Sequence, residues 1–343
     1  MNILVVGHRY FVQALQAAGH SVISLGSMGK GHDIACSSPV SAVRLQHILL
    51  KHGFEPQVLF YCDDGNLPIL HGQETLPWLS IFYSIDTYCN LWHIPLAHAY
   101  DFALAAQRDY ARMFSDEGHA AQWFPLFYSH AGPEQNSEEW LATRDIPISF
   151  VGTLQPRNIP ERLPFLENFN KLRPLRFEQG EYTAVFRRSR IVLNQSAASE
   201  LNFRLFEAAA CGAAVLNDTD GQGFTELFSV GVDMLPVYPR LNARKAAALA
   251  DYWLANPKGT ARVALAGRRK VTTLHGVEDR TQEFLRHCET LLQAQASLQR
   301  LADLKRRQRL ISTAYAILAD DLPGTLPEHK NFYGHLAAQY LDM

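Results

Sequence analysis

The segment from Ser199 to Gly212 carries the side chains best suited to bind a charged ligand. Asn202 and Arg204 stand in a polar loop that leads into a predicted helix, and Glu207 follows in its first turns. The N-terminus of a helix attracts anions through its free N–H groups and its positive dipole. A carboxylate nearby can accept two hydroxyl hydrogens from a sugar or ribose. The plainer alternative is that Glu207 complements the dipole and pairs with Arg204.

A second candidate loop follows the apolar run Ile3–Val6. A dinucleotide-binding turn would require further glycines at fixed offsets after Gly7, and His8, Arg9 and Phe11 fill that loop instead. The sequence therefore disfavours a hydride-transferring enzyme. Gly7 and His8 stay candidates for contacting a ligand, with a plain tight turn as the alternative.

Asp86 follows the predicted strand over residues 80–85, where it would face a ligand. It is the candidate general base if a reaction here requires an acceptor hydroxyl to lose its proton. Capping a helix that starts near Tyr88 is the alternative. Asp63 and Asp64 are adjacent, so in an extended chain their carboxylates point in different directions, and the sequence predicts no metal site there.

Short apolar runs alternate with helical patterns along most of the chain, which is typical of parallel sheets with right-handed crossovers. We expect residues 1–127 to form one such domain, 128–147 a polar linker and 148–285 a second domain. Residues 286–343 are predicted to form a helical tail. Ligands of open α/β sheets bind at the carboxyl ends of the strands, so two such domains facing one another would place the candidate loops on a common cleft.

The composition limits the classes of function. A chain of 343 residues, 47% hydrophobic and 19% charged, is long enough for two domains with buried cores. Lys and Arg number 32 against 34 Asp and Glu, which provides no basic surplus for binding nucleic acid. Five cysteines without a CxxC pair predict neither a disulfide framework nor a zinc site. No apolar stretch reaches the length of a membrane span, so we expect a soluble, cytoplasmic protein.

Several segments resemble the CgeB-type (spore maturation) glycosyltransferase-like proteins. The resemblance is most specific between residues 148 and 285, and absent over the tail. It rests on Phe150–Gly152, Arg157, Ser189–Asn194, Leu201–Gly212, Asn217–Asp218, Glu226–Phe228, Gly231 and Ala266–Val271, with His275, Arg280 and Trp123–Pro125 fitting as well.

The resemblance implies an α/β protein with the GT-B fold, in which two Rossmann-like doubly wound domains face a cleft. The nucleoside-diphosphate-sugar donor would bind the C-terminal domain and the acceptor mostly the N-terminal one. The loop with Gly152 and Arg157 would then face the diphosphate, and arginine suits that task through charge-assisted hydrogen bonds. Asn194 and Asn202 would bind donor hydroxyls, and capping of turns is the alternative for each.

The related glycosyltransferase family 4 carries a Glu-x7-Glu motif in its donor helix. Glu207 matches the second glutamate, which implies a contact to the nucleotide ribose. Ser199 stands at the place of the first, with Glu200 one residue later, and this departure leaves the stereochemistry of transfer open. GT-B enzymes generally bind no metal through an Asp-x-Asp motif. Arg157, Arg204 and a helix N-terminus would therefore neutralise the charge of the leaving group.

We therefore predict a glycosyltransferase that moves a sugar from a nucleoside-diphosphate donor to an unidentified acceptor, without a cofactor or an essential metal. The acceptor is a glycan, a protein or a small molecule, and Asp86 would activate it if the enzyme inverts. One alternative is an epimerase of nucleotide-sugars, which needs no acceptor. The other is a non-catalytic binding or assembly protein whose helical tail provides the partner surface, and the tail could also mediate a homo-oligomer.

Overall fold

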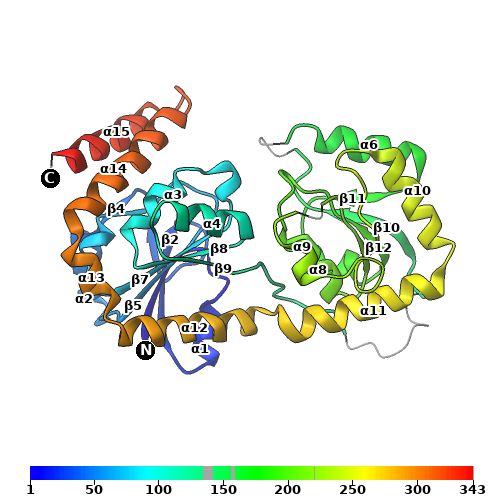
Figure 1. The fold of residues 1–343 in the computed structure, drawn as a ribbon, viewed down its shortest axis with the longest axis horizontal. Helices are drawn as coiled ribbons and strands as arrows, with labels where there is room; N and C mark the ends of the chain where they lie inside the picture. Colours follow the sequence, from blue (N-terminus) through cyan, green and yellow to red (C-terminus); the bar gives the residue numbers. More distant parts are fainter. Residues whose placement is uncertain (134–140, 142, 156–158, 220, 343) are drawn as a thin grey trace. The chain divides into compact units, whose positions relative to one another are not determined.

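The computed structural model describes residues 1–133, 141, 143–155, 159–219 and 221–342 (Figure 1). The chain divides into two compact units. The first unit comprises Met1–Phe124 and Thr281–Met343, and the second comprises Pro125–Arg280. The expected division assigned residues 286–343 to a tail of their own, whereas these helices belong to the same compact unit as the N-terminal sheet.

The first unit is built on a sheet of seven parallel strands in the order β3-β2-β1-β5-β7-β8-β9. Its strands are β1 (Asn2–Gly7), β2 (Ser21–Ser27), β3 (Ile34–Cys36), β5 (Val58–Cys62), β7 (Leu79–Ser84), β8 (Phe102–Ala105) and β9 (Ala121–Trp123). The central strands β5 and β7 are buried along their whole length, as expected for continuous apolar runs covered on both faces. A separate pair, β4 (Val40–Ser41) and β6 (Leu70–His71), is also parallel.

Helices from both ends of the chain cover this sheet. They are α1 (Val12–Ala17), α2 (Ala42–Lys51), α3 (His93–Leu96), α4 (Arg108–Asp116), α12 (Val277–Gln293), α13 (Ala296–Ala302), α14 (Leu304–Asp321) and α15 (Pro327–Leu341). α14 and α15 form a hairpin (Figure 1). Ile311 and Tyr315 of α14 and Tyr333 of α15 share one hydrophobic core with Leu4 and Phe82 of the sheet. Among the described residues, no helix combines the length and apolar character needed to cross a bilayer.

The second unit is built on four parallel strands in the order β11-β10-β12-β13. Its elements are β10 (Ile146–Val151), α6 (Arg162–Leu172), β11 (Arg176–Glu178), α7 (Thr183–Phe186), β12 (Ser189–Leu193), α8 (Phe203–Ala210), β13 (Ala214–Leu216), α9 (Phe224–Leu227), α10 (Ala243–Leu254) and α11 (Pro257–Leu274). Residues 232–236 are a run that could extend as a strand, but the chain there forms only an isolated bridge between Val230 and Met234, next to a turn in which Gly231 has φ +78°.

Candidate functional site

In the second unit, three predicted site residues, Arg204, Gly152 and Asn194, lie together at the carboxyl edge of the sheet. β10 ends at Val151, just before Gly152, and β12 ends just before Asn194. From the first turn of α8, Arg204 Nε donates to the Val151 carbonyl over 2.8 Å. Its Nη1 donates to Asn194 Oδ1 over 2.9 Å. The predicted loops after two neighbouring strands therefore meet at one guanidinium.

The contacts of Arg204 leave no room for a side chain at residue 152. The guanidinium lies over the Phe150 ring, 4.0 Å from its centroid. A Cβ built on Gly152, whose φ is +157°, would collide with Arg204 Nη2. Burial lowers the pKa of Arg204 to about 10, so the side chain stays charged at neutral pH. The result is a fixed cation whose Nη2 donates no hydrogen bond to the described residues.

The two asparagines predicted to bind donor hydroxyls have different surroundings. Asn194 is fully buried, and its Nδ2 donates to Asn217 Oδ1 over 2.7 Å while its Oδ1 accepts from Arg204. It thus orients Arg204. Asn202 is the N-cap residue of α8 but makes no side-chain capping bond. Its Oδ1 is buried and has no hydrogen-bond partner among the described residues, so it stays able to accept from a ligand.

Glu207 lies one turn after Arg204 on α8 and is half-buried. Burial raises the pKa of its carboxyl to about 7, with Arg204 opposing that rise and Glu181 adding to it. The side chain makes no hydrogen bond or ion pair with the described residues, so it is available to hydroxyl groups of a ligand. Its protonation state changes near neutral pH, which makes any such contact dependent on pH.

Glu200 has an internal role instead. Its carboxylate accepts the backbone N–H groups of Ala197 (2.7 Å) and Ala198 (2.5 Å), which folds the loop after β12 back on itself. Ser199 within this loop adopts a left-handed conformation, with φ +61°. The glutamate one residue beyond the motif position is therefore used to hold the loop.

Sequence reasoning assigned no role to two residues that shape this edge of the sheet. Buried Arg162 donates from Nε to Gln195 Oε1 over 2.7 Å and from Nη1 to the Thr153 carbonyl over 2.9 Å, which ties the loops after β10 and β12 together. Asp218 accepts the Ser196 N–H with both oxygens at 3.0 Å. A cation at the start of α6, the helix that follows β10, is the signal that could have indicated Arg162. The predicted Arg157 lies outside the described residues.

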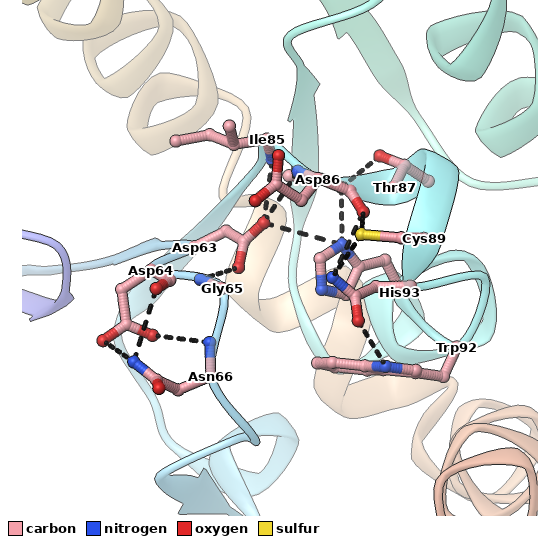
Figure 2. Close-up of polar contacts among 12 residues, drawn as sticks. Asp63, Asp64, Gly65, Asn66, Ile85, Asp86, Thr87, Cys89, Trp92 and His93 are labelled. Atoms are coloured by element: carbon pink, nitrogen blue, oxygen red, sulfur yellow. Dashed lines mark hydrogen bonds and ion pairs between the residues drawn. The ribbon is translucent and has the colours of Figure 1, made fainter. Parts of the chain in front are cut away.

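In the first unit, Asp86 follows β7 and begins a short 3-10 helix, Thr87–Cys89 (Figure 2). Its side chain makes no capping hydrogen bond, which argues against the alternative that Asp86 caps a helix. Its backbone N–H donates to Asp63 Oδ2 over 2.9 Å. The carboxylate reaches toward the loop after β5, since a Cβ on Gly65 would lie 3.6 Å from Asp86 Oδ2.

Asp63 and Asp64 diverge, as the sequence predicted. Buried Asp63 accepts the N–H groups of Gly65, Ile85 and Asp86, whereas Asp64 accepts from Asn66 and pairs with Lys30 at 3.0 Å. Within the described ranges, no cluster of three or more His, Cys, Asp or Glu side chains is arranged to hold a metal ion.

His93 lies under the same turn, fully buried, with Nδ1 2.8 Å from Ser84 Oγ and 3.9 Å from Asp63 Oδ2. Burial lowers the pKa of His93. Its hydrogen bond to Ser84 gives it a part in fixing the chain around Asp86.

Gly7 and His8 form a tight turn at the end of β1. Gly7 has φ +86°, and a Cβ there would collide with the Cys62 carbonyl. That same carbonyl accepts the His8 N–H over 2.8 Å. The His8 ring stacks on Tyr10, burial lowers its pKa to about 4, and its Nδ1 is buried without a partner among the described residues. The turn thus requires a glycine at residue 7, and one ring nitrogen of His8 has no hydrogen-bond partner within the described ranges.

The comparisons with known proteins agree with this architecture. Residues 138–286 match the model of a family described as glycosyl transferase-like. No match is found among curated protein sequences. The second unit, with the cluster around Arg204, falls almost entirely inside the matched segment.

Solved glycosyltransferases have the same fold. Alr3699/HepE of Anabaena, solved with UDP and glucose, is 10% identical with a TM-score of 0.62, covering 85% of this chain and 100% of that one. A glycosyltransferase of Rickettsia africae is 12% identical with a TM-score of 0.63, covering 85% and 98%. Sucrose-phosphate synthase of Thermosynechococcus elongatus is 13% identical with a TM-score of 0.63, covering 86% and 100%. The predicted GT-B fold, with two Rossmann-like units, is therefore confirmed.

Proposed function

We propose that this chain is a glycosyltransferase of the CgeB type that takes a sugar from a nucleoside-diphosphate donor held by the second unit. The observation that carries the proposal is the fixed Arg204 guanidinium at the carboxyl edge of the sheet, one turn before a Glu207 carboxylate that makes no hydrogen bond to the part of the chain that the structure describes. A cation beside a carboxylate suits a ligand with both phosphates and hydroxyls. The match of residues 138–286 to a glycosyl transferase-like family supports the proposal that the chain transfers a sugar.

Each residue has a distinct task in this proposal. The Glu207 carboxylate accepts hydrogen bonds from the ribose hydroxyls. Arg204 Nη2, the N-terminus of α8 and Arg157 neutralise the diphosphate as it leaves, in place of a metal ion. Asn202 Oδ1, which has no partner among the described residues, accepts a hydrogen bond from the donor.

The acceptor hydroxyl must lose its proton as its oxygen bonds to the anomeric carbon. If the enzyme inverts, Asp86 accepts that proton, and Asp63 keeps Asp86 in place through its backbone N–H. Asp86→Asn should then lower the transfer rate by roughly 10² to 10⁴-fold while nucleotide binding stays intact. An unchanged rate in this variant would exclude Asp86 as the base.

The donor site is tested by thermal unfolding with UDP, GDP, TDP, CDP or ADP, each with and without EDTA. A ligand at about 100 times its Kd adds roughly 2.7 kcal/mol to the free energy of unfolding. We expect one nucleotide to stabilise the protein regardless of EDTA, and Glu207→Ala to remove that effect. Glu167→Ala, an exposed carboxylate on α6, is the matched control and should leave it unchanged.

The same samples separate the alternatives. Conversion of a nucleotide-sugar into its isomer without an added acceptor would favour the epimerase. Stabilisation by none of the five nucleotides would contradict the proposal and favour a non-catalytic assembly protein.

A further inference from the structure

A cavity of about 420 Å³ lies in the first unit, between α15 and the loops that follow β2, β3 and β5. Its volume falls in the range of small-molecule sites, roughly 300–1,000 Å³. Neither Asp86 nor any residue of the cluster around Arg204 lines it.

The lining of the cavity combines polar groups with apolar surface. The polar groups are the hydroxyls of Ser27, Ser37 and Ser38, the amide of Asn66 and the imidazole of His329. These groups can both donate and accept hydrogen bonds. Leu67 and Met28, whose side chain is 66% exposed, supply apolar contact area.

No Asp, Glu, Lys or Arg is among the described residues that line the cavity. A charged ligand would lose its hydration there without gaining a partner of opposite charge, which is unfavourable. The lining therefore selects a neutral ligand that carries hydroxyl groups and an apolar face. A sugar ring has both properties.

The cavity lies at the functional edge of the sheet. Ser27 and Cys36 are the last residues of β2 and β3, and ligands of parallel sheets bind at the carboxyl ends of strands. Asn66 lies in the loop after β5, where its Nδ2 donates to Asp64 Oδ2 over 2.8 Å (Figure 2). The residue before Asp64 in that loop, Asp63, accepts the backbone N–H of Asp86. One short loop thus joins the cavity to the candidate base.

Helix α15 supplies the outer wall of the cavity through His329 and Tyr333. Tyr333 is buried, its hydroxyl donates to the Pro68 carbonyl over 3.1 Å, and its ring stacks on Tyr315 with centroids 6.0 Å apart. The wall is therefore held firmly. It belongs to a segment beyond the residues that match the glycosyl transferase-like family.

We propose that this cavity binds the acceptor as a neutral sugar ring and that α15 contributes to its specificity. The proposal rests on the glycosyltransferase function proposed above. In the transfer, an acceptor hydroxyl oxygen bonds to the anomeric carbon of the donor sugar, its proton goes to a carboxylate, and the bond to the nucleoside diphosphate breaks with the electron pair leaving on the diphosphate.

The free thiol of Cys36 allows the cavity to be tested without knowing the acceptor. Cys36 is half-buried and lines the cavity, Cys89 is exposed, and the other three cysteines are buried. In a full-length Cys89→Ser variant, a thiol reagent such as DTNB should therefore report on Cys36. Methyl glycosides of glucose, galactose, mannose and N-acetylglucosamine serve as probes. A glycoside at ten times its Kd should slow the modification roughly tenfold.

Variants show whether the protection arises in the cavity. Ser38→Trp, on an exposed loop residue, should fill the cavity and abolish protection. His329→Ala should weaken it, and His335→Ala, which changes an exposed histidine of α15 outside the lining, should not. No slowing by any of the four glycosides, or slowing that persists in Ser38→Trp, would overturn the proposal.

Stabilisation by nucleotide, measured on the same samples, distinguishes a failure of the acceptor cavity from a failure of the donor site proposed above. Loss of Cys36 protection with nucleotide stabilisation intact refutes only the acceptor cavity. Protection without nucleotide stabilisation refutes the donor site and keeps a sugar-binding cavity.

Discussion

The guanidinium of Arg204 occupies the space that any side chain at residue 152 would need. The two residues come from the first turn of α8 and the loop after β10, and both border the carboxyl edge of the second sheet. The position of the Arg204 guanidinium therefore requires a glycine at residue 152, and a larger residue at 152 would displace the guanidinium.

Gly152→Ala should displace Arg204 and remove the stabilisation by nucleotide. Gly180→Ala is the matched control, because Gly180 also has a positive φ, +132°, but a Cβ there would meet no atom within 4 Å. Both variants carry backbone strain of about 1–3 kcal/mol. The overpacked Gly152→Ala should lose about 1–3 kcal/mol more. Urea unfolding with and without nucleotide measures both effects, and equal losses would mean that the contact with Arg204 is not limiting.

Nucleotide binding should weaken as the pH falls through 7. Burial raises the pKa of Glu207 to about 7, and only its ionised form accepts hydrogen bonds from both ribose hydroxyls. From pH 7 to pH 6 the ionised fraction falls roughly fivefold, so the affinity should fall by about the same factor. Titration calorimetry at several pH values measures this dependence. Glu207→Gln should bind weakly at every pH, and an unaltered pH profile in that variant would assign the titration to another group.

The sequence predicted the strands and helices well because the central strands are continuous apolar runs, whose burial on both faces leaves a strong pattern. It also predicted that the carboxylates of Asp63 and Asp64 diverge, since that follows from local chain geometry alone. Contacts between distant segments leave no such pattern. Asn194 binds Asn217, 23 residues away, and Arg300 binds Asp101 across 199 residues.

Glu200 illustrates the same limit at the site itself. Its position next to the motif was visible in the sequence, but its bonds to the backbone of Ala197 and Ala198 depend on the left-handed turn at Ser199. Left-handed backbone is uncommon for serine, so the residue type gave no signal for it. Likewise the pattern of residues 286–343 predicted a helical tail without indicating which sheet its helices cover.

Acid should destabilise the first unit through the paired histidines His98 and His119, whose rings lie 5.2 Å apart. Burial lowers the pKa of His98 to about 4, and burial also lowers the pKa of His119; the nearby Arg307 adds to both shifts. Below pH 6.5 the unfolded chain binds protons that the folded chain does not. Stability is therefore full above about pH 6.5 and falls as the pH drops toward 4, by up to about 1.4 kcal/mol per pH unit for each proton.

Urea midpoints between pH 7 and pH 4 measure this loss. His119→Gln should reduce its slope, because one titrating group is gone, whereas His335→Gln on an exposed side chain should not. A slope unchanged by His119→Gln would place the acid sensitivity elsewhere.

The most destabilising single change in the last helices should be Arg300→Met. Arg300 is fully buried and donates from Nε to Asp101 Oδ1 over 2.9 Å and from Nη2 to the carbonyls of Leu76 and Trp78. Removing the guanidinium leaves a buried carboxylate without its partner, which costs about 3–5 kcal/mol. Arg306→Met breaks an exposed ion pair with Asp303 and should cost less than about 1 kcal/mol.

A double variant separates the loss of charge pairing from the loss of packing. Arg300→Met combined with Asp101→Asn removes the uncompensated charge, so it should be more stable than Arg300→Met alone, as judged by the urea midpoint. The Ser80 N–H, which donates to Asp101 over 2.7 Å, can still donate to the asparagine oxygen. If the double variant is no more stable, the cost arises from the lost bonds to the backbone carbonyls, and Arg300 then holds α13 to the sheet mainly through them.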